Sequence, residues 1–414
     1  MQTAQSMPEE LNPRILVVDD DPFIIELLRD FLEAAGFNIT LVEDPVQGLT
    51  LAQKEKFDVV LLDVMMPKMD GLTFLDHVKE TDDPPEVIMI TARADAQLVT
   101  RAMKAGAFDY IVKPISIQRL IMATKNALAR RALQRPTASS GVAAVGTLIR
   151  NFYVAGKETG RVCQQAHQLA RYFAFMLVSG PEGVGKGCWV HMLHALSDRA
   201  DKPLITIDCD QIARSDIARE LFGHVDRTDG SYVPGGLKRA DGGILWLRNL
   251  ETLPEFVQSH IAEYMDSGML TVPGLPEDDY LDVKIVASTR LDIEREDARK
   301  RFNANFLRRL SILHVQLHAL DRRKDEIVPL AAHLVQRIGE ERGRPARRLD
   351  STTMEIFKIY PWTGNLKQFV TVIEQAVDSS QQEAIYPQNL PAHLQEYQKD
   401  LSYQLAKNAA DLLK

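Results

Sequence analysis

Acidic side chains stand at the ends of two predicted strands near the N-terminus. Asp19 and Asp20 follow an apolar run at 15–18, and Asp63 follows another at 58–62. The carboxyl ends of parallel strands meet at one edge of an open sheet, so we expect the three carboxylates to lie together. Carboxylates that repel one another are stable together mainly when they hold a hard cation such as Mg²⁺. The sequence therefore predicts a magnesium site at this edge.

Two further polar residues end predicted strands of the same region. Thr91 ends the run at 86–90, and Lys113 ends the run at 109–112. A hydroxyl and an ammonium beside a metal-held aspartate can accept and stabilise a phosphoryl group, because phosphoryl transfer needs positioning and charge neutralisation. The alternative is that each aspartate caps a helix or a turn, as Asp after a strand usually does. The gathering of polar residues at several strand ends favours the phosphoryl site.

A glycine-rich stretch, GPEGVGK at 180–186, follows an apolar run and precedes a helical pattern. Glycines let backbone amides turn toward phosphate oxygens, the helix N-terminus adds its dipole, and the lysine reaches the outer phosphates. A chance glycine-rich turn is the alternative, and the context favours nucleotide binding. The predicted nucleotide-binding residues are Gly180, Glu182, Gly183, Val184, Gly185, Lys186 and Gly187.

The apolar periodicity predicts an α/β fold in two units. Alternating apolar and amphipathic stretches over 14–135 predict a doubly wound, flavodoxin-like parallel sheet, with strands at 15–18, 38–42, 58–62, 86–90 and 109–112. A second α/β unit over 148–320 has predicted strands at 175–178, 204–207, 244–247 and 283–288. Over 321–394 strands disappear and the pattern predicts a small helical lid. We expect disorder at 1–13, a linker at 136–147 and a terminal helix or tail at 395–414.

Composition limits the function classes. The 414 residues suit two to three domains, and 49 basic against 57 acidic residues give a net charge of -8, so no overall basic field attracts nucleic acid. No apolar run approaches the length of a membrane span, which predicts a cytoplasmic protein without a membrane partner. The ten histidines form no metal-binding motif. Cys163, Cys188 and Cys209 have no metal-ligand spacing, and we expect them as small apolar side chains.

Four motifs of the first unit resemble the receiver domain of two-component response regulators. They are VVDDD at 17–21, LLDVMMPKMDG at 61–71, MITA at 89–92 and DYIVKP at 109–114. The resemblance implies that Asp63 is the phosphoacceptor, that Mg²⁺ is held by Asp19, Asp20, Asp63 and the Met65 carbonyl, and that Lys113 pairs with the phosphate. It also implies a switch pair, Thr91 and Tyr110, although Tyr110 could serve plain core packing. The implied partner is a sensor histidine kinase or a phosphotransfer protein.

The region from about 150 to 394 resembles the AAA+ domain of NtrC-like activators of sigma-54 RNA polymerase. The motifs are ELFGH at 220–224, RADGGILWL at 239–247, DVKIVAST at 282–289, RRL at 308–310 and YPWTGNLKQF at 360–369. The resemblance implies a P-loop α/β subdomain with a helical lid, and ATP hydrolysis in a ring that remodels the polymerase. Gly187 stands where the general P-loop motif has Ser or Thr, but this family commonly lacks both there.

The chain departs from this family at the positions that carry hydrolysis. Arg248 and Asn249 replace the Asp-Glu pair that organises Mg²⁺ and polarises the attacking water, although a cation at 248 offers part of the metal's charge toward phosphates. Four further positions bear on the nucleotide: one arginine finger becomes Asn303, the second is retained as Arg309, the lid arginine becomes Lys367, and an asparagine becomes Arg290. Lysine is a weaker bidentate partner for phosphate than arginine.

The family's polymerase-contacting loop, GAFTGA, is missing. The nearest equivalent is Gly230–Gly235, either with Tyr232 in place of the aromatic tip or, as we favour, as a plain Gly/Pro turn. The basic stretch at 342–348 either touches phosphate or, as we favour, is a solvated loop. About twenty residues follow Leu394, which leaves no room for the usual helix-turn-helix, so no direct DNA binding is expected.

These observations predict a response regulator, phosphorylated on Asp63, that controls a degenerate AAA+ module. This module would bind but not hydrolyse ATP and act in transcriptional regulation by protein interaction. The alternative is an active ATPase that stimulates sigma-54 polymerase from solution or in mixed rings with a DNA-binding partner, where Arg309 serves a neighbour's nucleotide. A third possibility is that ATP binding sets the oligomeric state. A homo-oligomer or a mixed oligomer with a complete activator is expected.

Overall fold

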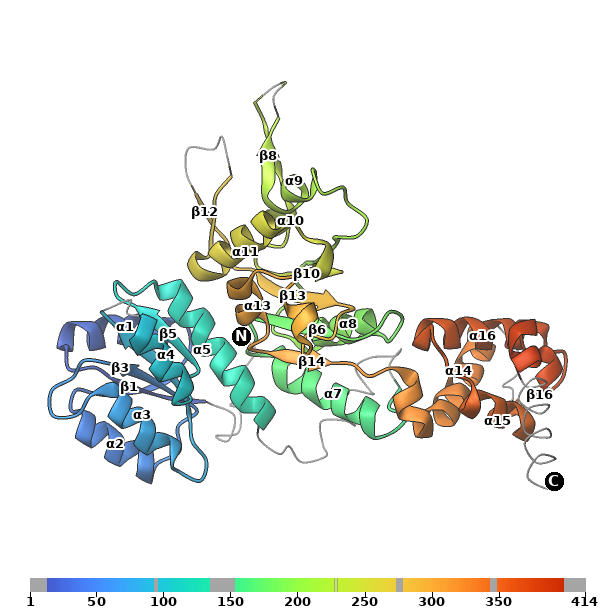
Figure 1. Ribbon diagram of the computed structural model, residues 1–414, viewed down its shortest axis with the longest axis horizontal. Coiled ribbons are helices and arrows are strands. Elements are labelled where there is room, and N and C mark those ends of the chain that lie inside the picture. Colours follow the sequence, from blue (N-terminus) through green and yellow to red (C-terminus); the bar gives the residue numbers. More distant parts are fainter. Residues whose placement is uncertain are drawn as a thin grey trace, which may run out of the picture.

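The computed structural model describes residues 13–92, 96–134, 153–226, 228, 230–272, 278–342 and 348–397. Two α/β units and a helical unit follow one another along the long axis of the molecule (Figure 1). The predicted linker at 136–147, all but one residue of the predicted N-terminal segment, and residues 398–414 of the predicted tail lie outside the described residues. Within the described part of the chain, no helix is both long and apolar enough to span a membrane.

The first unit is a five-stranded parallel sheet of order β2-β1-β3-β4-β5, which confirms the doubly wound prediction. Its strands are β1 Arg14–Val18, β2 Asn38–Val42, β3 Val59–Asp63, β4 Glu86–Thr91 and β5 Asp109–Val112. The helices are α1 Pro22–Ala34, α2 Pro45–Lys54, α3 Gly71–Lys79, α4 Ala96–Lys104 and α5 Ile117–Gln134. Because α1 and α5 cover one face and α2, α3 and α4 the other, the central strands are apolar throughout.

Three aspartates just outside the acidic pocket begin the helices that follow β1, β2 and β3. Asp21, Asp44 and Asp70 are the N-caps of α1, α2 and α3, and their side chains accept hydrogen bonds from backbone amides of the first turn. A carboxylate at this position satisfies an amide that has no partner within the helix. Asp19 and Asp63 are thus not needed as helix caps.

The second unit is another five-stranded parallel sheet, of order β14-β6-β13-β10-β7. Four strands match the prediction: β6 Phe175–Ser179, β7 Leu204–Asp208, β10 Ile244–Arg248 and β13 Lys284–Thr289. The edge strand β14, His314–Gln316, is too short for its pattern to predict. The accompanying helices are α7 Lys157–Ala170, α8 Lys186–Leu196, α9 Ile217–Phe222, α10 Gly236–Arg239, η2 Leu250–Thr252, α11 Glu255–Ser267, α12 Glu296–Arg299 and α13 Ala304–Leu310.

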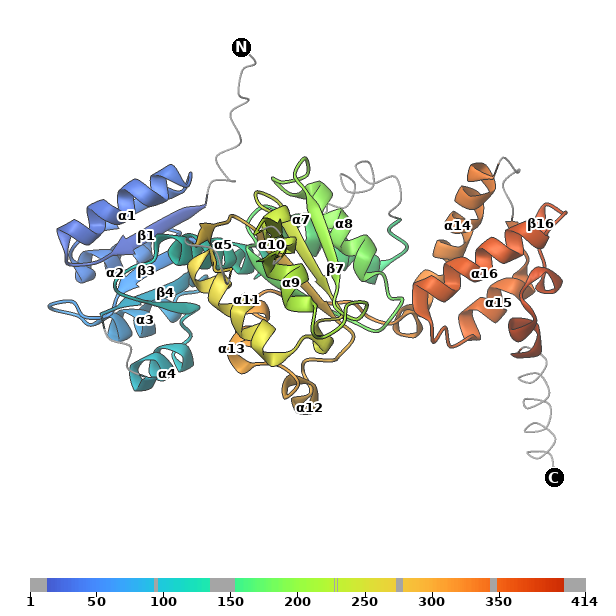
Figure 2. The ribbon, with the colours of Figure 1, turned by 90° about the horizontal axis from the view of Figure 1, so that it is seen from above.

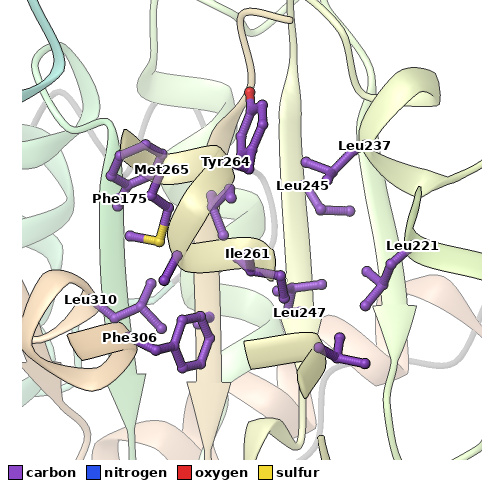
Figure 3. Packing of buried hydrophobic residues seen from close by; sticks show 14 of the residues in the cluster. Phe175, Leu221, Leu237, Leu245, Leu247, Ile261, Tyr264, Met265, Phe306 and Leu310 are labelled. Carbon is purple, nitrogen blue, oxygen red and sulfur yellow. The ribbon is translucent and has the colours of Figure 1, made fainter. Parts of the chain in front are cut away.

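Helices α11 and α13 close one face of this sheet. In this cluster Ile261 of α11 lies beside Leu247 of β10, and Met265 of α11 lies beside Phe175 of β6 (Figure 3). Phe306 and Leu310 of α13 lie next to each other in the same cluster. Two of the three cysteines, Cys163 and Cys209, are buried as expected. The expectation is wrong for Cys188, which is exposed in the first turn of α8.

The helical unit contains η3 Leu320–Glu326, α14 Ile327–Glu341, α15 Ser351–Ile359, α16 Asn365–Ser379 and η4 Pro387–Asn389 (Figure 2). Its core is built on edge-to-face contacts among Phe357, Trp362 and Phe369. The expectation of a lid without strands is wrong at one place, where β15 Arg348–Leu349 pairs in parallel with β16 Ala384–Ile385. Two-residue strands are too short to produce a period in the sequence.

Helix α5 joins the first unit to the second (Figures 1 and 2). Met122 belongs to one core cluster of the second unit and Ala129 to the other. Between them, the Oδ1 atom of the buried Asn126 accepts hydrogen bonds from the backbone amides of Ala174, at 2.8 Å, and Phe175, at 3.3 Å. The first residues of β6 are therefore hydrogen-bonded to the first unit.

We expect Asn126→Ala to lower the free energy of unfolding by about 1–3 kcal/mol, because it leaves two buried amides without an acceptor. Urea unfolding of the full chain measures this effect. A matched control is Gln336→Ala, which removes an exposed amide that contacts Glu340. Equal stability of the two variants would contradict the expectation.

Candidate functional site

The carboxyl edge of the first sheet brings together two predicted carboxylates and the predicted lysine. Asp19 lies just beyond β1 and is fully buried, and Asp63 ends β3 with 4% exposure. The Lys113 Nζ atom lies 2.9 Å from Asp19 Oδ2 and 2.6 Å from Asp63 Oδ1. The ammonium thus bridges two acids that are 44 positions apart in sequence.

Electrostatics in this pocket favour a bound cation. Burial raises the pKa of Asp19, although the hydrogen bond from Lys113 opposes the shift. Burial alone would lower the pKa of Lys113, but its hydrogen bonds to Asp63 and Asp19 raise it above the ordinary value. Buried carboxylates of this kind are stabilised by positive charge.

Two of the predicted Mg²⁺ ligands offer buried carboxylate oxygens, the type of donor that Mg²⁺ prefers. Asp19 and Asp63 supply buried oxygen donors, and the Met65 amide donates to Asp63 Oδ2 at 2.6 Å, which folds the loop after β3 around the pocket. The third predicted ligand, Asp20, has an exposed side chain. Among the described residues, no three His, Cys, Asp or Glu side chains are gathered in a metal-binding group.

The predicted switch pair lies on neighbouring strands. Thr91 ends β4 and is 2% exposed, and Tyr110 on β5 is half-buried, opposite Met89 in the strand register. The Tyr110 ring packs against the core cluster on the face covered by α2, α3 and α4. The Tyr110 ring therefore contributes to core packing, which is the alternative role predicted for it.

The glycine-rich stretch forms a tight loop between β6 and α8. Gly180, Gly183 and Gly185 have φ angles of +151°, +73° and +106°, which side chains with a Cβ rarely adopt. At Gly183 a Cβ would also come within 2.3 Å of the Gly364 carbonyl oxygen, so the backbone of the lid packs closely against the loop. Lys186 begins α8, and its Nζ donates to the Gly180 carbonyl at 2.5 Å.

A cavity of about 760 Å³ opens between this loop, β10 and the lid. Of the predicted nucleotide-binding residues, Glu182 to Gly187 line it and Gly180 does not. Lys367, predicted at the position of the lid arginine, lines it from the lid. The replaced positions Arg248, Asn249 and Arg290 also line it. Sequence reasoning missed Tyr153, Asp208 and Arg323, which come from separate elements and share no motif with the loop.

Three cationic side chains, Lys186, Arg248 and Arg290, lie close together at the loop. Burial lowers the pKa of Lys186 to about 8, and the nearby Arg290 and Arg248 add to the lowering, while Glu251 and Glu182 oppose it. A polyanion placed there would meet three positively charged side chains. This arrangement suits phosphate binding.

The two residues that replace the family's acidic pair are bound to an acid on the neighbouring strand. Arg248 Nη1 lies 3.1 Å from Asp208 Oδ2, and Asn249 Nδ2 donates to Asp208 Oδ1 at 2.7 Å. The guanidinium of Arg248 also lies 5.3 Å from the ring centre of Trp246. Both residues are therefore held in place by the fold.

Arg290 is held in a similar way. Its Nε donates to Glu251 Oε1 at 2.8 Å, and the other oxygen of Glu251 accepts from the Thr289 hydroxyl at 2.6 Å. Glu251 is largely buried, and hydrogen bonds from Thr289 and Arg290 lower its pKa although burial opposes the shift. No sequence signal identifies Asp208 and Glu251 as the partners of these arginines, because the pairs join residues about 40 positions apart.

The two arginine-finger positions lie away from this cavity. Asn303 is the N-cap of α13, where its Oδ1 accepts from the amides of Asn305 and Phe306. The retained Arg309 is 11% exposed and forms an ion pair with Asp266 of α11. Asp266 also pairs with Arg119 of α5, so Arg309 lies at the contact between the two units.

The predicted Gly/Pro turn at Gly230–Gly235 is wrong. Tyr232–Pro234 forms strand β9, which pairs antiparallel with β8, Gly223–Val225. Tyr232 pairs with Val225 at the loop end of this hairpin, and its side chain packs against the core cluster of the second unit. In the basic stretch at 342–348, residues 343–347 lie outside the described part of the chain, and Arg342 pairs with Asp378 and Glu374.

The fold and the sites define a class of protein: a receiver-like α/β domain joined to a P-loop α/β domain with a helical lid. Models of three families match in that order, a response regulator receiver domain at 15–125, a sigma-54 interaction domain at 153–316 and an AAA+ ATPase lid domain at 321–406. The chain belongs to the NtrC-like response regulators, which join a receiver domain to a sigma-54 interaction domain.

Similar proteins match over nearly the whole chain. The alginate biosynthesis transcriptional regulatory protein AlgB of Pseudomonas aeruginosa is 30% identical over 91% of this chain and 84% of its own length. The transcriptional regulatory protein ZraR of Salmonella typhimurium is 28% identical over 91% of this chain and 85% of its own length. The crystal structure of NtrX from Brucella abortus in complex with ATP matches with a TM-score of 0.54 and 26% identity, covering 94% of this chain and 86% of NtrX.

We expect Asp63→Asn to abolish phosphate incorporation from a small phosphodonor such as acetyl phosphate, because the amide is a poor nucleophile. Phosphate-affinity gel electrophoresis measures the modified fraction. The control Asp70→Asn changes an acid of the same loop that caps α3, and asparagine also serves as a cap. Phosphorylation of Asp63→Asn at the unchanged rate would exclude Asp63 as the acceptor.

Proposed function

We propose that this response regulator accepts a phosphoryl group on Asp63 and thereby controls an AAA+ module that binds ATP without hydrolysing it. The donor is a sensor histidine kinase or a phosphotransfer protein, and the module acts in transcriptional regulation by protein interaction. The observation that carries the proposal is the ion-pair network in the nucleotide cavity. There Arg248 and Asn249 occupy the family's acidic positions and are bound to Asp208.

In the receiver, one carboxylate oxygen of Asp63 bonds to phosphorus as the bond between phosphorus and the donor's nitrogen breaks. Asp19, Asp20, Asp63 and the Met65 carbonyl would hold Mg²⁺, and the ion would supply charge neutralisation at the phosphoryl group. Lys113 already contacts Asp63 and pairs with the added phosphate. The pocket is buried, so these charges act at short range with little screening.

Phosphorylation reaches the second unit through β5 and α5. In the proposed switch, the Thr91 hydroxyl turns to the phosphate and the Tyr110 ring follows. Arg119 Nη2 donates to the Tyr110 carbonyl at 3.2 Å, so a movement of β5 displaces the hydrogen-bond acceptor of Arg119. Arg119 shares Asp266 with Arg309, and this shared carboxylate links the phosphorylation site to the retained arginine finger.

The nucleotide cavity supports ATP binding and argues against turnover. Its glycine loop, Lys186 and the lid residue Lys367 surround a space of about 760 Å³, which suits a nucleotide. Hydrolysis needs a group that orients and activates a water beside the γ-phosphate. Neither Arg248 nor Asn249 can take a proton from water, and both oxygens of the nearest buried acid, Glu251, accept hydrogen bonds.

The alternative function is an active ATPase in mixed rings with a complete family member. The retained Arg309 favours it, because this residue lies outside its own chain's cavity, where a finger for a neighbour's nucleotide is expected. In such a ring the partner would supply the hydrolytic acids. Open-complex formation by sigma-54 polymerase, with and without a complete activator, separates the two functions.

We expect the purified full chain to bind ATP with no multiple-turnover hydrolysis, and Lys186→Ala to weaken binding at least about tenfold by removing a charge at the phosphates. Isothermal titration and phosphate release on one sample measure both properties. Lys358→Ala is a matched control, since Lys358 is exposed and pairs with Glu355 in the lid. Sustained phosphate release that Lys186→Ala abolishes would overturn the proposal.

Affinity for ATP is expected to fall as the pH rises through the pKa of Lys186, about 8 in the empty site. A polyphosphate favours the charged ammonium, so binding above that pKa requires uptake of a proton. Between about pH 7 and pH 9 we expect an approximately tenfold loss of affinity, measured by titration. Lys186→Arg, which stays charged, should remove this dependence. A wild-type affinity independent of pH would contradict the assignment.

A further inference from the structure

The AAA+ family implies Mg²⁺ beside the phosphate loop, and the side chains present there do not fit this ion. Mg²⁺ demands oxygen ligands, usually one or two carboxylates together with substrate phosphates. The end of β10 instead presents the guanidinium of Arg248 and the amide of Asn249. Gly187 has no side-chain oxygen, and the Trp246 ring lies where one would project, 3.3 Å from a Cβ placed at Gly187.

The two acids closest to these positions are already engaged. Asp208 uses one oxygen for Arg248 and the other for Asn249. Glu251 likewise uses both oxygens, for Thr289 and Arg290. Recruiting either acid to a cation would break the ion pair that positions its arginine.

We propose that this cavity binds a nucleoside triphosphate without a metal ion, with the Arg248 and Arg290 guanidiniums supplying the positive charge that Mg²⁺ supplies in complete family members. This inference rests on the proposed nucleotide binding and names the form of the ligand, the metal-free polyphosphate. A guanidinium suits this role because its charge is permanent and its planar donors match phosphate oxygens in pairs.

Both arginines are positioned to donate into the cavity. Arg290 uses Nε for Glu251, while its Nη1 and Nη2 lie 4.0 Å from Glu182 and 3.7 Å from Asp210, beyond hydrogen-bonding distance. These two donor nitrogens can turn to phosphate without breaking the bond to Glu251. Arg248 is 45% exposed at the cavity wall, so its side chain is not sealed in the network with Asp208.

The anchors of these arginines favour a preformed site. Trp246 and Asp208 hold Arg248 from two sides, and the Trp246 indole is itself fixed by a hydrogen bond of 3.0 Å to the Ser288 hydroxyl. Side chains that are already ordered lose less conformational entropy when the ligand binds. Together with Lys186, two fixed cations face the loop that wraps the phosphates.

The test is a titration of the full chain with ATP in excess Mg²⁺ and in excess EDTA. We expect affinities within about threefold of each other, or tighter binding in EDTA, because the metal competes with the arginines for the phosphates. Binding in Mg²⁺ that is lost in EDTA would overturn the inference and leave the proposed nucleotide function intact. No binding in either condition would overturn both.

Two variants sharpen the result. Arg248→Ala should lower affinity at least about tenfold in EDTA, and the double variant Arg248→Asp with Asn249→Glu should make binding depend on Mg²⁺. Arg295→Ala is the matched control, since Arg295 is exposed outside the cavity and pairs with Asp297. Unchanged binding by Arg248→Ala in EDTA would exclude Arg248 from the site. Thermal unfolding of each variant checks that the fold is retained.

Discussion

Burying a carboxylate away from water costs free energy unless a cation lies beside it. Three acids of this protein are each stabilised by such a cation. Asp19 is paired with Lys113 in the receiver, Asp208 with Arg248 in the nucleotide cavity, and Asp266 with Arg119 and Arg309 between the two units. Burial raises the pKa of Asp266 while both arginines oppose the shift. Each ion pair joins elements that are distant in sequence, so together they tie the phosphorylation pocket, the interface and the nucleotide cavity to one folded arrangement.

The two phosphate sites share a topology but differ in the sign of their charge. Both lie at the carboxyl edge of a parallel sheet, where strand ends deliver side chains to a common point. In the receiver this point gathers two acids around a lysine, which suits a metal ion and an incoming phosphoryl group. In the second unit a lysine and two arginines meet at this edge, which suits the binding of a polyphosphate. The same architecture therefore presents mainly acids at one sheet edge and several cations at the other.

Helix α5 is the element that contacts both α/β units. It belongs to the receiver core, yet Asn126 holds the first amides of β6 and Arg119 reaches Asp266 on α11. A helix packed on two cores cannot shift against one without disturbing the other, because packed interiors tolerate little displacement. The retained Arg309 lies at this contact, whereas Asn303 has become a helix cap. The contact with the receiver thus involves the residue that the family resemblance predicts as the retained finger.

Much of the architecture could be predicted from the sequence, because long apolar runs and glycine-rich turns leave a local signal. Such signals predicted nine of the ten strands in the two main sheets, the order of the units and the phosphate loop. The short pairs β8–β9 and β15–β16 were missed, since two or three residues carry no period. The replacement of Asp-Glu by Arg248 and Asn249 was visible in the sequence, but the partners Asp208 and Glu251 were not. Sequence by itself determined which residue types reach each strand end, and only the tertiary structure decided which charges meet, because an ion pair depends on distances between elements that the order of residues does not specify.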